Sequence, residues 1–276
     1  MDTFIDFFAN LTSLQKLIWI VGMLTIFWLL EGAYPLRKFD YKKWEHAKPN
    51  LILLATTIII NVLFGLATVS IFNWLEQSQF GLLNMVELPV WVEMILAVLL
   101  LDFLAQYVVH FMLHKVKFMW RFHMVHHSDT KVDVTSGTRH HPIDFMMRET
   151  FALLAIIIAG LPLAYYVFYR ILTILFTYFS HANMKLPLKL DKAISLVFIS
   201  PNTHKFHHHF EVPWTDTNYG NIFSIWDWIF GTFVYHNPYD IVYGLDVLDE
   251  EKSDDIMYQL KVPFNYSKKI DNKIPN

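Results

Sequence analysis

Long apolar runs alternate with short charged connections along this chain of 276 residues. The first run covers roughly 14–33 and ends before Pro35, the second covers roughly 51–75, and the third covers roughly 90–113. Each is long enough to cross the hydrocarbon core of a bilayer, which takes about 20 helical residues at about 1.5 Å each. The pattern therefore predicts three membrane-spanning helices in the first part of the chain.

A fourth apolar region, from Glu149 to Phe179, is interrupted. Gly160-Leu161-Pro162 divides it into pieces of roughly 11 and 17 residues, and neither piece alone is a comfortable span. We therefore expect a helical hairpin bent at 160–162 that penetrates the membrane wholly or in part.

The charged connections predict the orientation of these helices. The segment 36–48 carries five Lys or Arg, whereas 76–88 carries none. Because cytoplasmic connections are enriched in Lys and Arg, 36–48 is expected in the cytoplasm. The end of the third run and the segment 115–148, with six Lys or Arg, then lie on the same side. Asp2 and Asp6 stand where a signal peptide would be positively charged, so the first run is expected to stay in the membrane.

Composition agrees with a membrane protein. Hydrophobic residues make up 54% of the chain and aromatic residues 17%, with a mean hydropathy of +0.33. We predict an all-α integral membrane protein with about four to five membrane-embedded helices and a cytoplasmic, histidine-rich helical cap. Residues 1–276 are expected to form a single domain, with a catalytic core at about 102–232 and a polar tail at about 240–276. A net charge of −3 argues against a nucleic-acid partner.

Histidines recur at helical spacing where the third apolar run ends. His110 and His114 are four apart, so on a helix their rings lie about 40° apart on one face. Two further clusters place histidines at i, i+3 and i+4, and these are His123, His126 and His127, and His204, His207 and His208. Ionisable side chains near a membrane are costly unless they serve a site, so the three clusters together indicate a metal site.

The residue types restrict which metal the site could bind. The chain has no cysteine, so any metal must be held by nitrogen and oxygen. Imidazole-rich ligand sets suit iron, copper, zinc or nickel. His141 and His181 bring the candidate ligands to ten, about five for each of two metals, whereas one zinc ion needs only about four ligands.

The motifs resemble those of the fatty acid hydroxylase / sterol desaturase superfamily of membrane di-iron oxygenases. H-x3-H and two H-x2-HH motifs occur with RHHP, HANMKLP and NYGNIFSIWDWIFGT over roughly 102–232. The resemblance implies an enzyme that uses two iron ions and O2 to hydroxylate or desaturate a lipid, such as a fatty acyl chain or a sterol. It implies that the irons are held by His110, His114, His123, His126, His127, His181, His204, His207 and His208, with His141 as a tenth ligand.

Several neighbours of these histidines bear on the same site. Asp102, Asp144 and Asp227 are the candidates for carboxylates that accept a hydrogen bond from a ligating imidazole. Asp102 could instead be a buried aspartate satisfied by a neighbouring helix, and Asp144 stands where the superfamily usually has Glu. His140 and His209 adjoin candidate ligands, and either could replace its neighbour if the register differs by one.

Four isolated polar residues have simpler interpretations. His46 and His236 are expected to face solvent. Arg170 is expected either to extend toward the membrane surface or to pair with an acid. Glu31, near the end of the first run, could be structural or could line a path for lipid.

The chain has no recognisable means of moving electrons. There is no G-x-G-x-x-G motif for a nicotinamide or flavin domain, and no segment resembling cytochrome b5. The resemblance therefore implies an external electron donor, which would be a separate reductase, a ferredoxin or a cytochrome b5-type protein.

Two other classes of function remain open. A membrane zinc hydrolase would need fewer histidines, and the H-E-x-x-H motif is missing. A metal transporter or other non-enzymatic metal-binding protein would place its ligands near the bilayer midplane, whereas these clusters lie at one face. Hydroxylation and desaturation are not separable from the sequence, and hydroxylation is the more economical prediction.

Overall fold

The computed structural model describes residues 2–265, and within that range the chain is helical, with two isolated β-bridges and no strand. The predicted all-α class is confirmed. The helices are α1 (Asp2–Ala9), α2 (Ser13–Ala33), α3 (Lys43–Ser78), α4 (Val90–Asp102), a π-helix (Phe103–Val108), α5 (Val109–Lys115), α6 (Lys117–His127), α7 (Pro142–Ala159), α8 (Leu163–His181), α9 (Leu188–Ile194), α10 (Pro201–His207), α11 (Ile225–Ile229) and α12 (Ile256–Lys261). Short 3₁₀ turns lie at Leu82–Met85, Val134–Thr138, Trp214–Asp216, Glu250–Lys252 and Val262–Phe264.

Four helical stretches are long and apolar enough to cross a membrane, as expected of an integral membrane protein. They are Ser13–Ala33, Lys43–Met85, Val90–Lys115 and Leu163–His181. The three predicted runs are therefore all helical. α3 begins eight residues before its apolar run, because the helix continues through the polar segment that precedes it.

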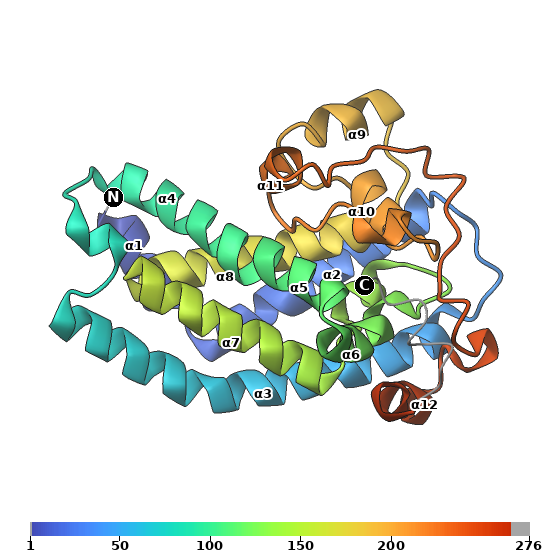
Figure 1. The fold of residues 1–276 in the computed structure, drawn as a ribbon, viewed down its shortest axis with the longest axis horizontal. Helices are drawn as coiled ribbons and strands as arrows, with labels where there is room; N and C mark the ends of the chain where they lie inside the picture. Colours follow the sequence, from blue (N-terminus) through green and yellow to red (C-terminus); the bar gives the residue numbers. More distant parts are fainter. Residues whose placement is uncertain (1, 266–276) are drawn as a thin grey trace.

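The long helices α2, α3, α4, α7 and α8 run beside one another along the length of the molecule, and α6 and α9–α12 gather at one end (Figure 1). The largest apolar core joins four of them through Leu75 of α3, Leu101 of α4, Ile156 of α7 and Tyr169 of α8. The bundle therefore presents one end to a separate cap of short helices.

α7 and α8 form the predicted hairpin. α7 ends at Ala159, and Gly160 follows in the left-handed region at φ 66°, with its N–H donating to Ile156 O at 2.8 Å. α8 begins after Pro162. Between the arms, Arg170 Nη1 lies 2.7 Å from Glu149 Oε1, so Arg170 pairs with an acid.

The third span is not one continuous α-helix. A π-helix at Phe103–Val108 separates α4 from α5, which the sequence did not predict. A π-helix turns less per residue than an α-helix, so it changes the rotation of α5 relative to α4. The span thereby delivers His110 and His114 to the cap end of the bundle.

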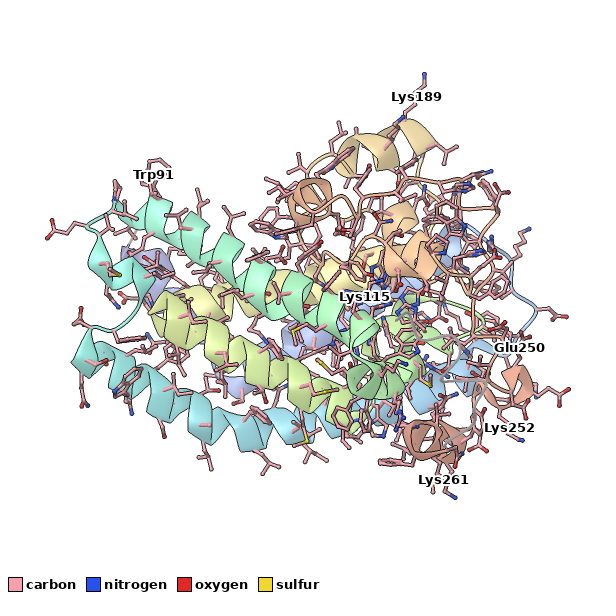
Figure 2. All side chains as sticks on the ribbon, viewed as in Figure 1. Trp91, Lys115, Lys189, Glu250, Lys252 and Lys261 are labelled. Carbon is pink, nitrogen blue, oxygen red and sulfur yellow. The ribbon has the colours of Figure 1, made fainter. Side chains whose placement is uncertain are left out.

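Lysine side chains lie at the cap end of the molecule. Figure 2 shows Lys189, Glu250, Lys252 and Lys261 on the cap, and Trp91 at the opposite end of the bundle. Part of the segment expected to be a polar tail packs into the cap. Its buried residues include Ile241, Tyr243, Leu245, Ser253, Gln259 and Val262. The last part of the expected tail, 266–276, lies outside the described residues.

His46 does not face solvent, so that expectation was wrong. The residue is 1% exposed, its Nδ1 lies 2.8 Å from Asp254 Oδ1, and its Nε2 lies 3.5 Å from Asp129 Oδ2. Its partners come from two segments distant in sequence, which the local pattern could not reveal. The His236 side chain is 48% exposed, as predicted.

Glu31 has a structural role at the cap end of α2. Its Oε2 accepts hydrogen bonds from Val134 N and Asn183 N, each at 2.9 Å. Its Oε1 lies 2.8 Å from Lys43 Nζ. Glu31 thus ties α2 to the loop after α6 and to the end of α8.

Candidate metal centre

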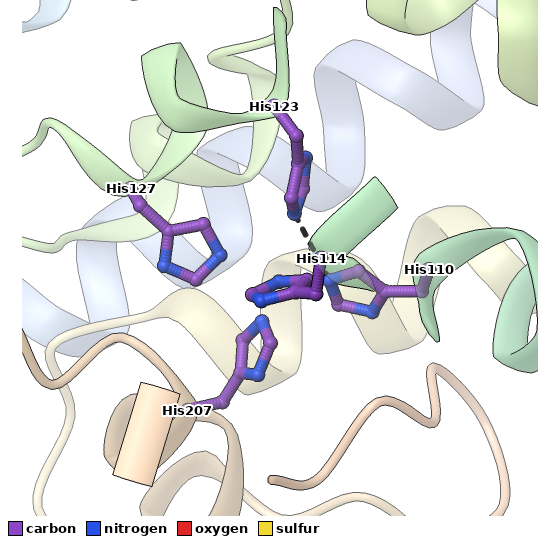
Figure 3. Close-up of side chains that lie close together, drawn as sticks. All are labelled: His110, His114, His123, His127 and His207. Carbon is purple, nitrogen blue, oxygen red and sulfur yellow. Dashed lines mark hydrogen bonds between the residues drawn. The ribbon is translucent and has the colours of Figure 1, made fainter. Parts of the chain in front are cut away.

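Nine buried histidines converge where the bundle meets the cap, and they form two groups. The first group is His110, His114, His123, His127 and His207, and the second is His126, His181, His204 and His208. Within each group, one ring nitrogen per residue lies within 4.8 Å of the others. Figure 3 shows the five rings of the first group turned toward one another. The two groups adjoin, because the rings of His127 and His208 stack at 4.6 Å.

The helices explain why these rings converge. Histidines four apart lie about 40° apart on a helix, so both members of a pair can reach one point. His110 with His114, His123 with His127, and His204 with His208 each stay within one group. His126 and His207 lie on a different side of their helices, and each joins the other group.

The distances between ring nitrogens fit ligands of a shared ion. His110 Nε2 and His123 Nε2 are 3.1 Å apart, and His181 Nε2 lies 2.9 Å from His204 Nε2 and 3.3 Å from the Nε2 atoms of His126 and His208. Two imidazole nitrogens bound at about 2.0–2.1 Å to one ion, at angles of about 90–110°, would be roughly 2.8–3.4 Å apart.

Unpartnered nitrogens point to the same conclusion. The Nε2 atoms of His114, His127 and His207 are buried without a hydrogen-bond partner among the described residues. A buried polar atom without a partner is costly, and a cation would satisfy all three. The donor set of each group therefore fits a metal ion.

Burial lowers the pKa values of the candidate ligands on α6 and at the end of α10. Burial lowers the pKa of His123 to about 3, despite the nearby Asp144. Burial, followed by the neighbouring imidazoles, lowers the pKa values of further ligand candidates well below the usual value, namely His126, His127, His204, His207 and His208. Neutral imidazole is the form that binds a metal, so these rings need not lose a proton first.

Backbone carbonyls orient three of the rings. His110 Nδ1 lies 2.8 Å from Tyr219 O, His207 Nδ1 lies 2.6 Å from Thr217 O, and His181 Nδ1 lies 2.7 Å from Thr177 O. A carbonyl only accepts, so each Nδ1 carries the proton and leaves Nε2 free to face its group.

Carboxylates orient two more rings of the first group. His123 Nδ1 lies 3.3 Å from Asp144 Oδ1, as the sequence suggested. His114 Nδ1 lies 3.2 Å from Asp216 Oδ1, and the other oxygen of this carboxylate, Oδ2, lies 2.6 Å from Lys115 Nζ. The sequence analysis missed Asp216, whose only sequence signal is its place eight residues beyond the last histidine cluster.

Asp227 and Asp102 contact no candidate ligand. Asp227 accepts hydrogen bonds from Tyr219 N and Gly220 N at 2.8 and 3.0 Å, and so holds the segment whose carbonyl contacts His110. Burial raises the pKa of Asp227 to about 6. Asp102 accepts from the backbone N–H groups of residues 222 and 223 and from Trp226 Nε1 at 3.0 Å. It is therefore the buried, satisfied aspartate considered as the alternative.

His141 does not join either group, contrary to expectation. Pro142 begins α7, and His141 caps that helix by accepting a hydrogen bond from Ile143 N at 3.1 Å. Its ring lies against Phe122 and Phe264, with centroids 5.2 and 6.1 Å away.

The two neighbouring histidines do not replace ligands either. The ring of His140 stacks on His126 at 4.8 Å, and its Nδ1 lies 2.9 Å from Asp144 Oδ2. His209 lies outside both groups, and its Nδ1 accepts from Val242 N.

A cavity of about 170 Å³ reaches both histidine groups from among the membrane-embedded helices. Its lining includes His110 of the first group and His126, His181 and His204 of the second. Further along, its walls include apolar side chains of several helices, such as Leu54, Ile58, Ala152 and Ile174. The arrangement can hold an apolar segment beside the histidines and away from water.

Comparison with known proteins identifies relatives with named activities. The sequence model of the fatty acid hydroxylase family matches residues 94–232. An ornithine lipid hydroxylase of Rhizobium tropici is 29% identical over 150 residues, which cover 54% of this chain and 44% of that protein. The alkylglycerol monooxygenase of Homo sapiens is 29% identical over 137 residues, which cover 49% of this chain and 29% of that protein.

A very-long-chain aldehyde decarbonylase of Oryza sativa subsp. indica is 25% identical over 235 residues, which cover 79% of this chain and 88% of that protein. The chain thus spans less than half the length of the first two relatives and most of the length of the third. No solved structure matches the chain significantly.

Proposed function

The chain belongs to the fatty acid hydroxylase family, and on this premise we propose that it is an iron- and O2-dependent oxidoreductase that hydroxylates a lipid. The observation that carries the proposal is the meeting of two buried histidine groups at one cavity among membrane-embedded helices. The named activities of two relatives, a lipid hydroxylase and a monooxygenase, support hydroxylation over desaturation.

Nine histidines are proposed to hold two iron ions, five in the first group and four in the second. When bound, the ions would supply the activation of O2 and the oxidation of an unactivated C–H bond. Five of the ring orientations are already fixed, by the carboxylates of Asp144 and Asp216 and by the backbone carbonyls of Thr177, Thr217 and Tyr219. These histidines therefore need little rearrangement when they bind iron.

The rest of the site positions the lipid. The apolar walls of the cavity hold a hydrocarbon segment beside the histidines and exclude water, which limits side reactions. Hydroxylation replaces a C–H bond by C–OH, reduces the second oxygen atom to water, and consumes two electrons and two protons. We propose that an external donor supplies the electrons, as a separate reductase, a ferredoxin or a cytochrome b5-type protein.

We further propose a multi-pass orientation with the histidine groups on the cytoplasmic side. The basic segment 36–48 leads into α3 and includes its first turns at the cap end of the bundle, whereas 76–88 lies at the opposite end (Figure 1). The excess of Lys and Arg at the cap end supports a cytoplasmic location for that end.

The proposal is tested by comparing lipids from cells that express the native chain or His208→Ala, with an electron donor present. We expect one lipid class to gain a single oxygen only with the native chain, and the purified variant to contain less iron. Loss of two hydrogens instead would identify a desaturase. Equal lipid profiles with good expression of both proteins would contradict oxidative chemistry, and zinc as the sole metal would then favour a hydrolase.

A further inference from the structure

One wall of the cavity is charged, although it lies among membrane-embedded helices. Arg170 of α8 and Glu149 of α7 both line the cavity, with Nη1 and Oε1 2.7 Å apart. Ionisable side chains in such a position are expensive and commonly mark the path of a substrate. The pair therefore requires an explanation beyond the packing of two helices.

The pair retains unused hydrogen-bonding capacity. A guanidinium has five N–H donors, and among the described residues Arg170 donates one hydrogen bond, to Glu149. Its guanidinium also lies over the face of the Tyr166 ring, 5.9 Å from the centroid. The side chain is 27% exposed and lines the cavity, so its free donors can reach a molecule held there.

The charged pair and the histidines lie at two positions along one helix face. Arg170, Thr173, Thr177 and His181 are spaced by three or four residues, and all of them line the cavity. From Arg170 to His181 the helix rises by about 16 Å, at about 1.5 Å per residue. A molecule extended along this face could contact the pair at one point and the histidines at another.

The charges of the pair select the chemistry of the bound group. Glu149 would repel a carboxylate or phosphate, and Arg170 would repel a cation. An uncharged group that both donates and accepts hydrogen bonds, such as a hydroxyl or a secondary amide, complements both partners. We propose that Arg170 and Glu149 bind a hydroxyl or amide group of the lipid substrate, and that this anchor determines which carbon reaches the histidines.

This inference extends the proposed function, but its first test measures binding and needs no turnover. The purified full-length protein in lipid nanodiscs is titrated with tritiated 1-hexadecanol, N-methylhexadecanamide, hexadecane and hexadecanoate. We expect the alcohol and the amide to bind about tenfold or more tightly than the other two, as one or two hydrogen bonds to charged groups provide. Equal binding of all four probes would overturn the proposal.

Variants distinguish a pair that binds the substrate from a pair that only joins α7 to α8. In the double variant Glu149→Leu/Arg170→Leu, apolar side chains replace the whole pair, which commonly preserves folding. We expect an unchanged melting temperature and loss of the preference for alcohol and amide. Retained preference in the folded double variant would mean that the pair only joins the helices, and would overturn the proposal.

Tyr165→Phe is the matched control, because it removes a hydrogen bond of α8 to Glu93 of α4, at 3.0 Å, outside the cavity lining. It should keep the native preference for the alcohol and the amide.

A second experiment examines the product in cells that form one. The native chain should oxidise one position of the lipid and the double variant several, and oxidation of the same single position by the double variant would refute the positioning role. Selective binding without any oxidised product would support the anchor and contradict the oxidative function.

Discussion

At the residue scale, helical geometry explains how the histidines divide. On a helix, positions i and i+4 lie about 40° apart, whereas i+3 and i+4 lie about 100° apart. His126 and His127 are neighbours in sequence but belong to different groups, as do His207 and His208. Eight of the nine histidines that converge could therefore be predicted from their helical spacing, and the i, i+4 pairs among them each fall in one group. His181 has no histidine three or four residues away, so spacing alone could not place it in the site.

This division predicts different effects for two adjacent substitutions. His126→Ala would leave three histidines in the second group, whereas His127→Ala would leave four in the first. Because about four protein ligands are usual for a closed site, we expect iron in His126→Ala to fall to about half of the native content and to fall less in His127→Ala. Elemental analysis of the purified proteins measures this difference.

His141→Ala is the control for this comparison, because His141 lies outside both groups. It should retain the native iron content, with a stability loss of about 0.5–2 kcal/mol from the missing helix cap. Equal iron loss in the His126 and His127 variants would contradict the division, and iron loss in His141→Ala would restore that residue as a ligand.

Other residues of the site were not predictable, because tertiary contacts decide their direction. His140 and His141 are equivalent in the sequence, but His141 caps α7 and so turns away from the metal centre. Asp216 reaches His114 only because its loop folds back over the end of α5. His46 is buried by Asp129 and Asp254, which come from two distant segments.

At the element scale, the sequence predicted the hairpin but not the π-helix. Gly160 and Pro162 are strong local signals for a helix end and a new start. The segment Phe103–Val108 contains no comparable signal, and its apolar residues fit an ordinary span. In the structure, Phe103 and Tyr107 of this segment stack on Phe230, with centroids 5.7 and 5.3 Å apart, and no local pattern encodes these contacts.

The hairpin turn gives a prediction about glycine. A Cβ at Gly160 would lie 2.2 Å from Phe80 O and 2.7 Å from Gly81 Cα, and φ is 66°. We expect Gly160→Ala to destabilise the protein by about 2 kcal/mol or more, from left-handed backbone strain and this clash. Thermal unfolding of the purified protein in detergent measures the loss.

Gly65→Ala provides the contrast within α3, where an added Cβ would meet nothing within 4 Å. It should leave stability unchanged or raise it by about 0.5–1 kcal/mol, because alanine favours a helix. If the two substitutions lowered the unfolding temperature equally, the close approach of Gly160 to Phe80 and Gly81 would not stabilise the hairpin.

At the scale of the whole molecule, apolar patterning predicted a membrane bundle and a cap, but not how the C-terminal part joins them. Charge near residue 250 suggested a solvated tail. In the structure, Ser253 and Gln259 are buried against the end of α6, where both bond to Ser128. These polar contacts lie beside an apolar cluster in which Leu245 and Val262 pack with Trp120 and Met124 of α6, so both kinds of contact join the C-terminal part to the cap.

Arg139 joins α3, α6 and the C-terminal part of the chain, and its substitution gives the last prediction. It is fully buried, and it donates to Val125 O and Asn50 Oδ1 at 3.0 Å each, and to Ser128 Oγ and Ser253 O. Lysine cannot reproduce this planar set of donors, so Arg139→Lys leaves buried acceptors without partners. We expect a loss of about 3 kcal/mol or more in the free energy of unfolding.

The same substitution should weaken metal retention, although Arg139 contacts no candidate ligand. Its partners Val125 and Ser128 flank His126 and His127, one from each histidine group, so loosening the end of α6 moves ligands of both groups at once. Iron release to a chelator, followed over time, should be faster than in Lys117→Ala, which changes an exposed residue of the same helix. A destabilised Arg139→Lys protein that released iron at the native rate would show that the metal centre is held independently of the C-terminal part.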